Sequence, residues 1–282
     1  MHRISLLLFC LLIAPSAWGQ QSAVDEYWAA RERGEAALTQ KFGSCADAKP
    51  DFKMDEYNAE AERLNGELEP LMRRVIGRAT PPAPFSGDGS FAPGLGCGLG
   101  MDALDGIRLW AEGSGGADGS SMVLTTAGLL RRWLQRNEPN HPQWQANLDA
   151  AFRSGDLNTE MIDAEAWREA FAILPIDKPA GLDAAFAVLG ESGNGSLIWP
   201  PQMISFYVRK GDRIFLADLA LATRFAPLEA CGDPNKPTWS EENLARYNNC
   251  WKQRGDKEPA FADAVRQAQA FVDALAAVQF SP

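Results

Sequence analysis

Residues 203–217, MISFYVRKGDRIFLA, indicate the fold class most directly. Two segments rich in β-branched and aromatic residues, Met203–Arg209 and Arg213–Ala217, flank the tripeptide Lys210-Gly211-Asp212. Because glycine and aspartate are typical of tight hairpin turns, we expect two antiparallel strands here. Segments of the same character occur at Gly106–Glu112, Ala184–Leu189 and Ser196–Trp199. The sequence therefore predicts a small antiparallel sheet in the later part of the chain.

Two long helices are predicted before these strands. Apolar residues recur at three- and four-residue spacing from Met54 to Val75, which is the stripe that a packed helix needs. Residues 22–42 have a looser stripe, and the polar turn between the two segments favours an antiparallel helical hairpin. Pro70 removes one backbone donor from the second helix, so we expect a kink or a restart there.

Further helices are predicted where a capping residue precedes an apolar periodicity. They are a helix over 122–136 capped by Ser121, one opening at Pro142, one over 159–174, one capped by Thr238 and Glu241 that ends near Trp251, and a final amphipathic helix through Leu275. The predicted fold class is α+β. A helical hairpin over 20–78 and a Gly/Pro-rich loop over 79–100 precede a mixed region over 101–282, in which helices flank the sheet.

The first residues, MHRISLLLFCLLIAPSAWG, have the organisation of a secretory signal peptide over 1–19. A basic start precedes the apolar run Leu6–Ala14, and Ala17-Trp18-Gly19 places small residues at the −3 and −1 positions of a cleavage site. The run is too short to span a bilayer, although an uncleaved anchor is the alternative. We expect cleavage before Gln20, a periplasmic or secreted protein, and no membrane span after cleavage.

Four cysteines follow this leader: Cys45, Cys97, Cys231 and Cys250. An even number in an oxidising compartment is typical of disulfides. Loop closure costs least entropy between neighbours, which favours Cys45–Cys97 and Cys231–Cys250 among the three possible pairings. The first bond would tie the loop 79–100 back to the hairpin. A nucleophilic thiol is the alternative role for a cysteine.

The composition, 46% hydrophobic and 23% charged, is that of a protein with a packed core. The net charge of −10 argues against broad nucleic-acid binding, which needs a basic surface, and it is compatible with a cationic protein partner.

Histidine restricts the chemistry, because His141 is the only one after the leader. Zinc motifs of the HExxH type and clusters of several histidines are excluded, so no metal and no cofactor is predicted. The chain has neither a G-x-S-x-G elbow nor an S-x-x-K motif.

One carboxylate stands out as a weak catalytic candidate. Glu191-Ser192 follows the apolar run 184–189 and resembles, over these two residues, the Glu-Ser dipeptide of lytic transglycosylases. The resemblance implies that Glu191 acts in a peptidoglycan-cleaving glycosidase, a reaction that needs only one or two carboxylates. A solvated turn is the competing interpretation.

Arg131, Arg132 and Arg136 form a basic island around Trp133. Guanidinium groups bind carboxylates and phosphates through two hydrogen bonds, so the island is a candidate site for an anionic ligand or an acidic partner loop. A solvated helix face is the alternative. Exposed loops over 113–120, 190–196 and 231–250 could present anchor residues to a partner, and Trp239 is the candidate in the last loop.

Because no catalytic set is found, the sequence favours an exported, non-catalytic binding protein with a protein partner. An immunity-type inhibitor of a cell-wall hydrolase is one concrete form. The alternative is a peptidoglycan glycosidase that uses Glu191, which requires a deep cleft around that residue. A binder of small ligands is a third hypothesis, and it requires a cavity.

Overall fold

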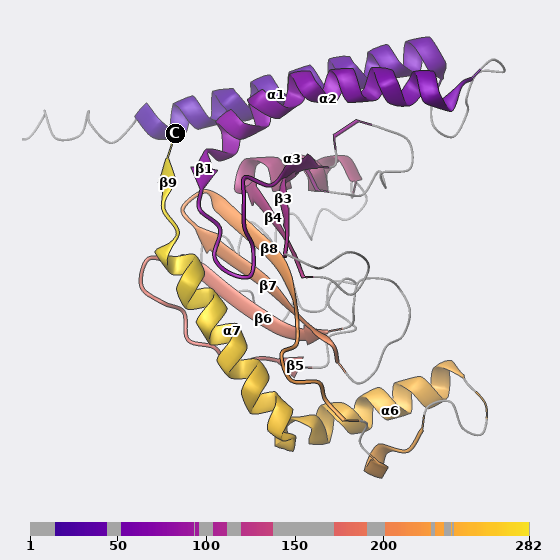
Figure 1. Cartoon of the computed structure of the whole chain (residues 1–282), viewed down its shortest axis with the longest axis vertical. Coiled ribbons are helices and arrows are strands. Elements are labelled where there is room, and N and C mark those ends of the chain that lie inside the picture. The colour runs from indigo at the N-terminus through magenta and orange to yellow at the C-terminus, as the bar shows by residue number, and fades with distance from the viewer. Residues whose placement is uncertain are drawn as a thin grey trace, which may run out of the picture.

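The protein is an α+β protein, as predicted (Figure 1). A hairpin of two long helices lies along one end of an antiparallel sheet, helix α7 (Pro259–Ala277) runs along the sheet, and α6 (Glu241–Arg254) lies at the end away from the hairpin. The computed structural model describes residues 15–43, 52–92, 94–95, 104–111, 120–137, 172–190, 201–226, 229–233, 238 and 240–281.

The helical hairpin consists of α1 (Pro15–Phe42) and α2 (Met54–Ile76). Its apolar stripes face each other, and the buried residues of α2 are Tyr57, Ala61, Leu64, Leu68, Met72, Val75 and Ile76. The predicted restart at Pro70 is wrong, because α2 runs unbroken through it. Gly66, four residues earlier, is exposed with no atom near the position of a Cβ. The carbonyl that loses the Pro70 donor therefore lies on the solvent side, where water can satisfy it.

Among the described residues, seven strands form one sheet in which every neighbouring pair is antiparallel. Their order is β2 (Ser90–Ala92), β3 (Gly106–Trp110), β4 (Ser121–Thr126), β8 (Arg213–Ala220), β7 (Met203–Lys210), β6 (Ala184–Gly190) and β5 (Ala172–Ile173). Strands β7 and β8 form the predicted hairpin, in which Lys210 pairs with Arg213. The two-residue turn requires the positive φ of 61° that Gly211 adopts.

Three predicted boundaries differ from the structure. Residues 121–126 form strand β4 instead of the start of a helix, and α3 (Ala127–Asn137) follows them. A serine before an apolar run imitates a helix cap, but SMVLTT alternates in burial and pairs on both sides within the sheet. Residues 172–173 are strand β5 and not the end of a helix. The cap of α6 is Ser240 rather than Thr238, since its hydroxyl accepts a hydrogen bond from the Asn243 backbone N–H at 3.1 Å.

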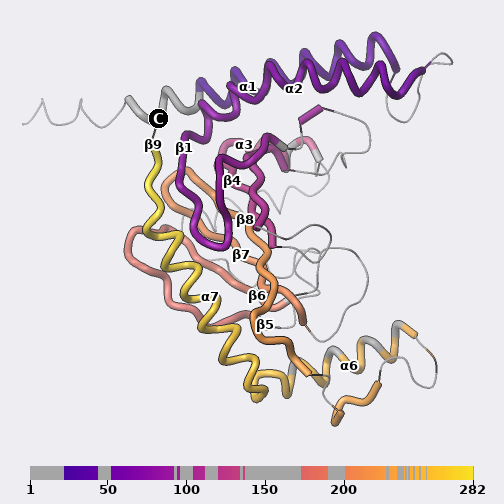
Figure 2. Tube along the Cα trace, in the orientation of Figure 1, coloured from indigo at the N-terminus to yellow at the C-terminus, as the bar shows by residue number. Residues whose placement is uncertain are grey.

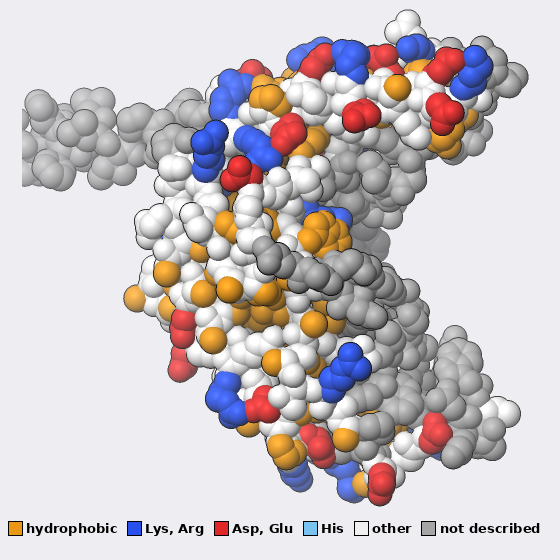
Figure 3. Space-filling view, in the orientation of Figure 1, with side chains coloured by type: hydrophobic (Ala, Val, Ile, Leu, Met, Phe, Trp, Pro, Cys, Tyr) orange, Lys and Arg blue, Asp and Glu red, His pale blue; other side chains and the backbone are white. Residues whose placement is uncertain are grey.

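The two faces of the sheet are covered differently. On one face Phe206 packs edge-on against Phe271 of α7, with ring centroids 4.9 Å apart, in a large cluster that also includes residues of α1 and α2. On the other face a smaller cluster gathers under α3 around Leu130 and Tyr207. Figure 3 shows acidic and basic side chains intermixed along the hairpin, and hydrophobic side chains gathered over the middle of the molecule.

The last strand closes the fold onto the hairpin. Strand β9 (Phe280–Ser281) pairs with β1 (Arg78–Ala79), directly after α2, so that distant parts of the chain meet (Figure 2). Arg213 Nε donates to the Ile76 carbonyl at 2.5 Å and thereby joins β8 to the end of α2.

Candidate binding face of the sheet

The strand register aligns six residues in one row across the sheet. Directly paired residues of neighbouring antiparallel strands point to the same face. Following the pairs from β3 to β5 gives Trp110, Ser121, Asp218, Ser205, Val188 and Ile173. We call these residues the cross-sheet row. It lies on the face opposite α7, because Ser205 and Phe206 are neighbours in one strand and point to opposite faces.

The cross-sheet row has apolar ends and a polar centre, and its member Val188 is buried. Trp110 is 47% exposed at one end, and Ile173 is 46% exposed at the other. In the described part of the chain only Met54, at 50%, is an equally exposed large hydrophobic residue. Two of these three side chains therefore share one row on one face of the sheet.

Asp218 is the charged group at the centre of the row. The Ser205 hydroxyl donates a hydrogen bond of 2.6 Å to its carboxylate. Burial raises the pKa of Asp218, while the hydrogen bond from Ser205 and the positive charge of Arg108 oppose that rise. A desolvated carboxylate with a hydroxyl and a guanidinium nearby is a group that a polar ligand can recognise.

A second row runs beside the first on the same face. It consists of Arg108, Val123, Leu216, Tyr207 and Phe186. The Arg108 guanidinium lies 5.7 Å from the centroid of the Trp110 ring. That geometry is a cation–π contact, which holds a half-buried arginine against an exposed tryptophan.

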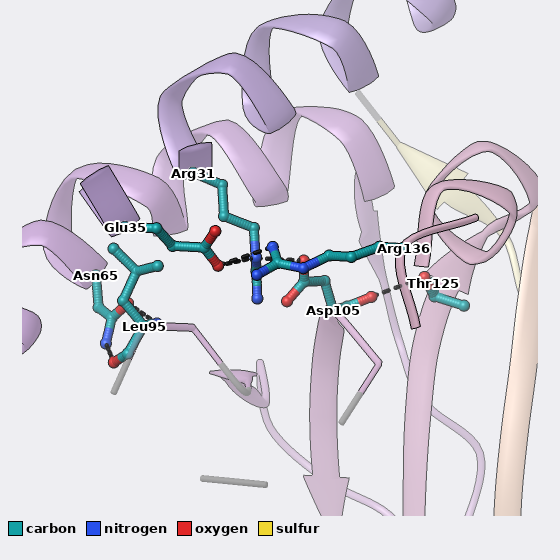
Figure 4. A network of polar contacts seen from close by, with 7 residues as sticks. All are labelled: Arg31, Glu35, Asn65, Leu95, Asp105, Thr125 and Arg136. Atoms are coloured by element: carbon teal, nitrogen blue, oxygen red, sulfur yellow. Dashed lines mark hydrogen bonds and ion pairs between the residues drawn. The ribbon is translucent and has the colours of Figure 1, made fainter. Parts of the chain in front are cut away.

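An ionic cluster around the buried residues Asp105 and Arg31 lies where the hairpin meets the sheet (Figure 4). Arg31 of α1 places Nε 2.9 Å from a carboxylate oxygen of Asp105, a residue that is 1% exposed and directly precedes β3. Glu35 accepts a hydrogen bond from Arg31 and another, at 2.8 Å, from Arg136 of α3. The cluster thus joins α1, α3 and the entry to β3.

Burial dominates the electrostatics of this cluster. It raises the pKa of Asp105 to about 6, and Glu35 adds to the rise, whereas Arg31, Tyr27 and Arg136 oppose it. The same burial, with the negative charge of Asp105, holds the pKa of Tyr27 well above its usual value. The contact between Arg31 Nε and the Asp105 carboxylate is an ion pair that lacks the alignment of a hydrogen bond.

Hydrogen bonds to the backbone hold the surroundings of the cluster in place (Figure 4). The Thr125 hydroxyl donates to the Asp105 carbonyl at 2.8 Å. The Asn65 amide of α2 donates to the Leu95 carbonyl at 2.8 Å and accepts from the Leu95 N–H at 2.6 Å. The cluster and these bonds fix how the hairpin sits on the sheet.

The predicted arginine island contacts the hairpin. Arg132 donates to Asp25 of α1 at 2.9 Å, and Arg136 donates to Glu35. Arg131 is exposed. Burial raises the pKa of Asp212, and the positive charge of Arg131 is one of those that oppose this rise. An external anion at Arg132 or Arg136 would therefore compete with carboxylates of the same chain.

The other predicted site residues divide between the described and undescribed parts of the chain. Cys231 and Cys250 form the predicted disulfide, with Cα atoms 5.5 Å apart. Glu191, Trp239, Cys45, Cys97 and His141 lie outside the described residues, as do the helix expected at Pro142 and the strand expected at Ser196–Trp199.

The sequence alone does not predict the cross-sheet row. Its members come from strands between residues 110 and 218, and only the pairing register brings them together. One local signal was present, because Asp218 interrupts the apolar run of β8. An acidic residue inside a strand that is otherwise apolar indicates a polar position on a sheet face.

No family model matches the chain, and comparisons with curated proteins and with solved structures find no match either. Over the described residues, no helix is both long and apolar enough to cross a membrane. Within the same residues, no three His, Cys, Asp or Glu side chains are grouped so that they could hold a metal ion.

Proposed function

We propose that this chain is an exported, non-catalytic binding protein that engages a protein partner through the face carrying the cross-sheet row. The observation that carries the proposal is the pairing of exposed Trp110 with Arg108 beside a polar centre. Tryptophan and arginine are the residues most often found as energetic anchors of protein interfaces. Export is supported by the order of basic, apolar and small residues in the leader.

The dimensions of the face suit such an interface. Six strands contribute to the row, and five gaps of about 4.8 Å make it about 24 Å long. A standard protein interface covers about 800 Å² on each partner, which corresponds to a patch about 28 Å across. The Trp110 ring would anchor the partner, and Asp218 with Ser205 would select for donors on its surface.

An inhibitor of an exported cell-wall hydrolase is the concrete form of this proposal. The acidic net charge of −10 supports a cationic partner, because opposite charges speed the association of two proteins. A hydrolase whose activity on purified peptidoglycan falls when this protein is added would be such a partner.

The first experiment uses the mature protein to capture partners from the exported fraction and then measures the affinity for each one. We expect Trp110→Ala to weaken binding by about 30-fold or more, as the loss of an anchor residue does. Met54→Ala is the matched control, because Met54 is as exposed as Trp110 but lies at the start of α2. Equal loss of affinity in both variants, or none in either, contradicts the proposal.

The second experiment tests the enzymatic alternative on purified peptidoglycan. The wild-type protein should release no glycan fragments, and Glu191→Gln and Asp218→Asn should behave like it. Turnover by the wild type that disappears in folded Glu191→Gln would show that the protein is a glycosidase and that the binding proposal is wrong.

A further inference from the structure

A pocket lies on the other face of the sheet, beneath the end of α2 and the loop that follows β1. Its volume is about 210 Å³. A cavity of roughly 150 Å³ already holds a benzene ring. The pocket therefore has room for one ring or one branched chain with a short substituent.

The floor of the pocket is apolar and belongs to the core of the protein. Strands β3, β4 and β8 supply it, and none of its side chains is more than 5% exposed: Ile107, Leu109, Met122, Leu124 and Phe215. Val278, just before β9, forms part of the wall. A charged group could not be placed on this floor without losing its hydration, so any charge of a ligand has to sit at the rim.

Two arginines stand at the rim, and they differ in what they already bind. Arg73 donates to Glu69 at 2.9 and 2.7 Å and to the carbonyls of Asp88 and Gly89 at 3.1 and 3.0 Å, so its charge and its donors are used. Arg78 is exposed, and no residue in the described part of the chain forms a hydrogen bond or ion pair with its guanidinium. The rim thus offers one cation without a partner among the described residues, above an apolar floor, and the exposed Asp88 is the acidic residue of the lining.

We propose that this pocket binds a small apolar carboxylate, with its ring or branched chain on the floor and its carboxylate at Arg78. A guanidinium matches a carboxylate because two parallel N–H groups can donate to its two oxygens. A neutral ligand of the same shape would leave Arg78 unpaired, and a cationic one would be repelled. The site is independent of the partner-binding face, because its floor and the cross-sheet row lie on opposite faces of the sheet.

Titration calorimetry at pH 7 tests the proposal with three probes that each carry a phenyl ring and differ in charge: phenylacetate (anionic), benzyl alcohol (neutral) and benzylamine (cationic). Phenylacetate should bind with an affinity about 10-fold higher than benzyl alcohol, since a charge-assisted hydrogen bond contributes about that factor. Benzylamine should bind more weakly than either. Arg78→Gln should lower the affinity for phenylacetate by about 10-fold and leave that for benzyl alcohol unchanged.

Two further variants separate the pocket from a general charge effect. Arg224→Gln removes another exposed arginine, away from the pocket lining, and should change nothing. Ala79→Trp fills the pocket and should abolish binding of all three probes. If Ala79→Trp does not fold, Arg78→Gln still decides the question, because that side chain is on the surface.

Three results would overturn the proposal: no saturable binding of phenylacetate, equal affinity for the three probes, or an unchanged affinity in Arg78→Gln. Each of them leaves the partner-binding proposal standing, since that proposal depends on Trp110 and is read out by capture of a protein.

Discussion

Asp105 makes the stability of this protein dependent on pH. Its side chain is 1% exposed, and burial raises its pKa in the folded state to about 6, from an ordinary value of 3.8. The folded state therefore holds the proton more tightly than the unfolded state does. The contribution of this group to stability is fully present below about pH 4 and is lost as the pH rises through about 6.

The size of the effect follows from the two pKa values. A difference of about two pH units corresponds to about 3 kcal/mol in the free energy of unfolding. The ion pair with Arg31 does not offset this loss, because two charges taken out of water lose more hydration energy than a poorly aligned contact returns. Asp105→Asn keeps the shape of the side chain and removes its ionisation, while Arg31 retains Glu35 as a partner.

The assay is denaturant-induced unfolding, followed by tryptophan fluorescence between pH 4 and pH 8. The free energy of unfolding of Asp105→Asn minus that of the wild type should rise by about 2.5 kcal/mol from pH 4 to pH 7.5, because a small part of the full change already occurs below pH 4. Taking this difference cancels the contribution of every other titrating group. Asp88→Asn, at an exposed position in the loop after β1, should give a difference that is flat within a few tenths of a kcal/mol. A flat difference for Asp105→Asn, or one that falls with pH, would refute the argument.

Three other predictions concern the chain itself. The intact mass of protein from the exported fraction should correspond to an N-terminus at Gln20, and a mass that retains the leader would contradict this. Peptide mapping without reduction should find Cys45 linked to Cys97, and a link from Cys45 to either C-terminal cysteine would show that nearest-neighbour pairing fails. Gly255→Ala should lower the free energy of unfolding by about 1–3 kcal/mol, because a Cβ there would lie 2.0–2.4 Å from the buried ring of Trp251. Gly66→Ala, in open space inside α2, should raise it by about 0.5–1 kcal/mol. Similar unfolding midpoints for the two variants would contradict the packing around Gly255.

The sequence predicts those elements whose signals are local. The β7–β8 hairpin follows from two apolar runs and the glycine between them, and α2 follows from the spacing of its apolar residues. The predicted α+β class is confirmed, because it depends only on the presence of these helices and strands. Ser121 shows where local signals fail, because a cap and the start of a strand look alike until the neighbours β3 and β8 are known.

Both candidate sites depend on contacts between distant segments, so the sequence could not predict them. Trp110 and Asp218 lie in one row only because both pair with Ser121 of β4, which lies between their strands. The pocket above β3, β4 and β8 requires Arg78, Phe215 and Val278 to meet, and the β1–β9 pairing brings the segment of Val278 to that of Arg78. Charge alone predicts an anion site at Arg132 and Arg136, and the structure places a carboxylate of α1 at each of them.

The cross-sheet row also determines which changes the protein can tolerate over evolutionary time. The members of the row are fixed by which residues of neighbouring strands pair directly. The loops that connect the strands can therefore lengthen or shorten without moving any member of the row. A single residue gained within β8 is different, since every position beyond it would turn to the opposite face and Asp218 would leave the row. If the row binds a partner as proposed, related chains should accumulate insertions and deletions between strands and almost none inside β4, β7 and β8.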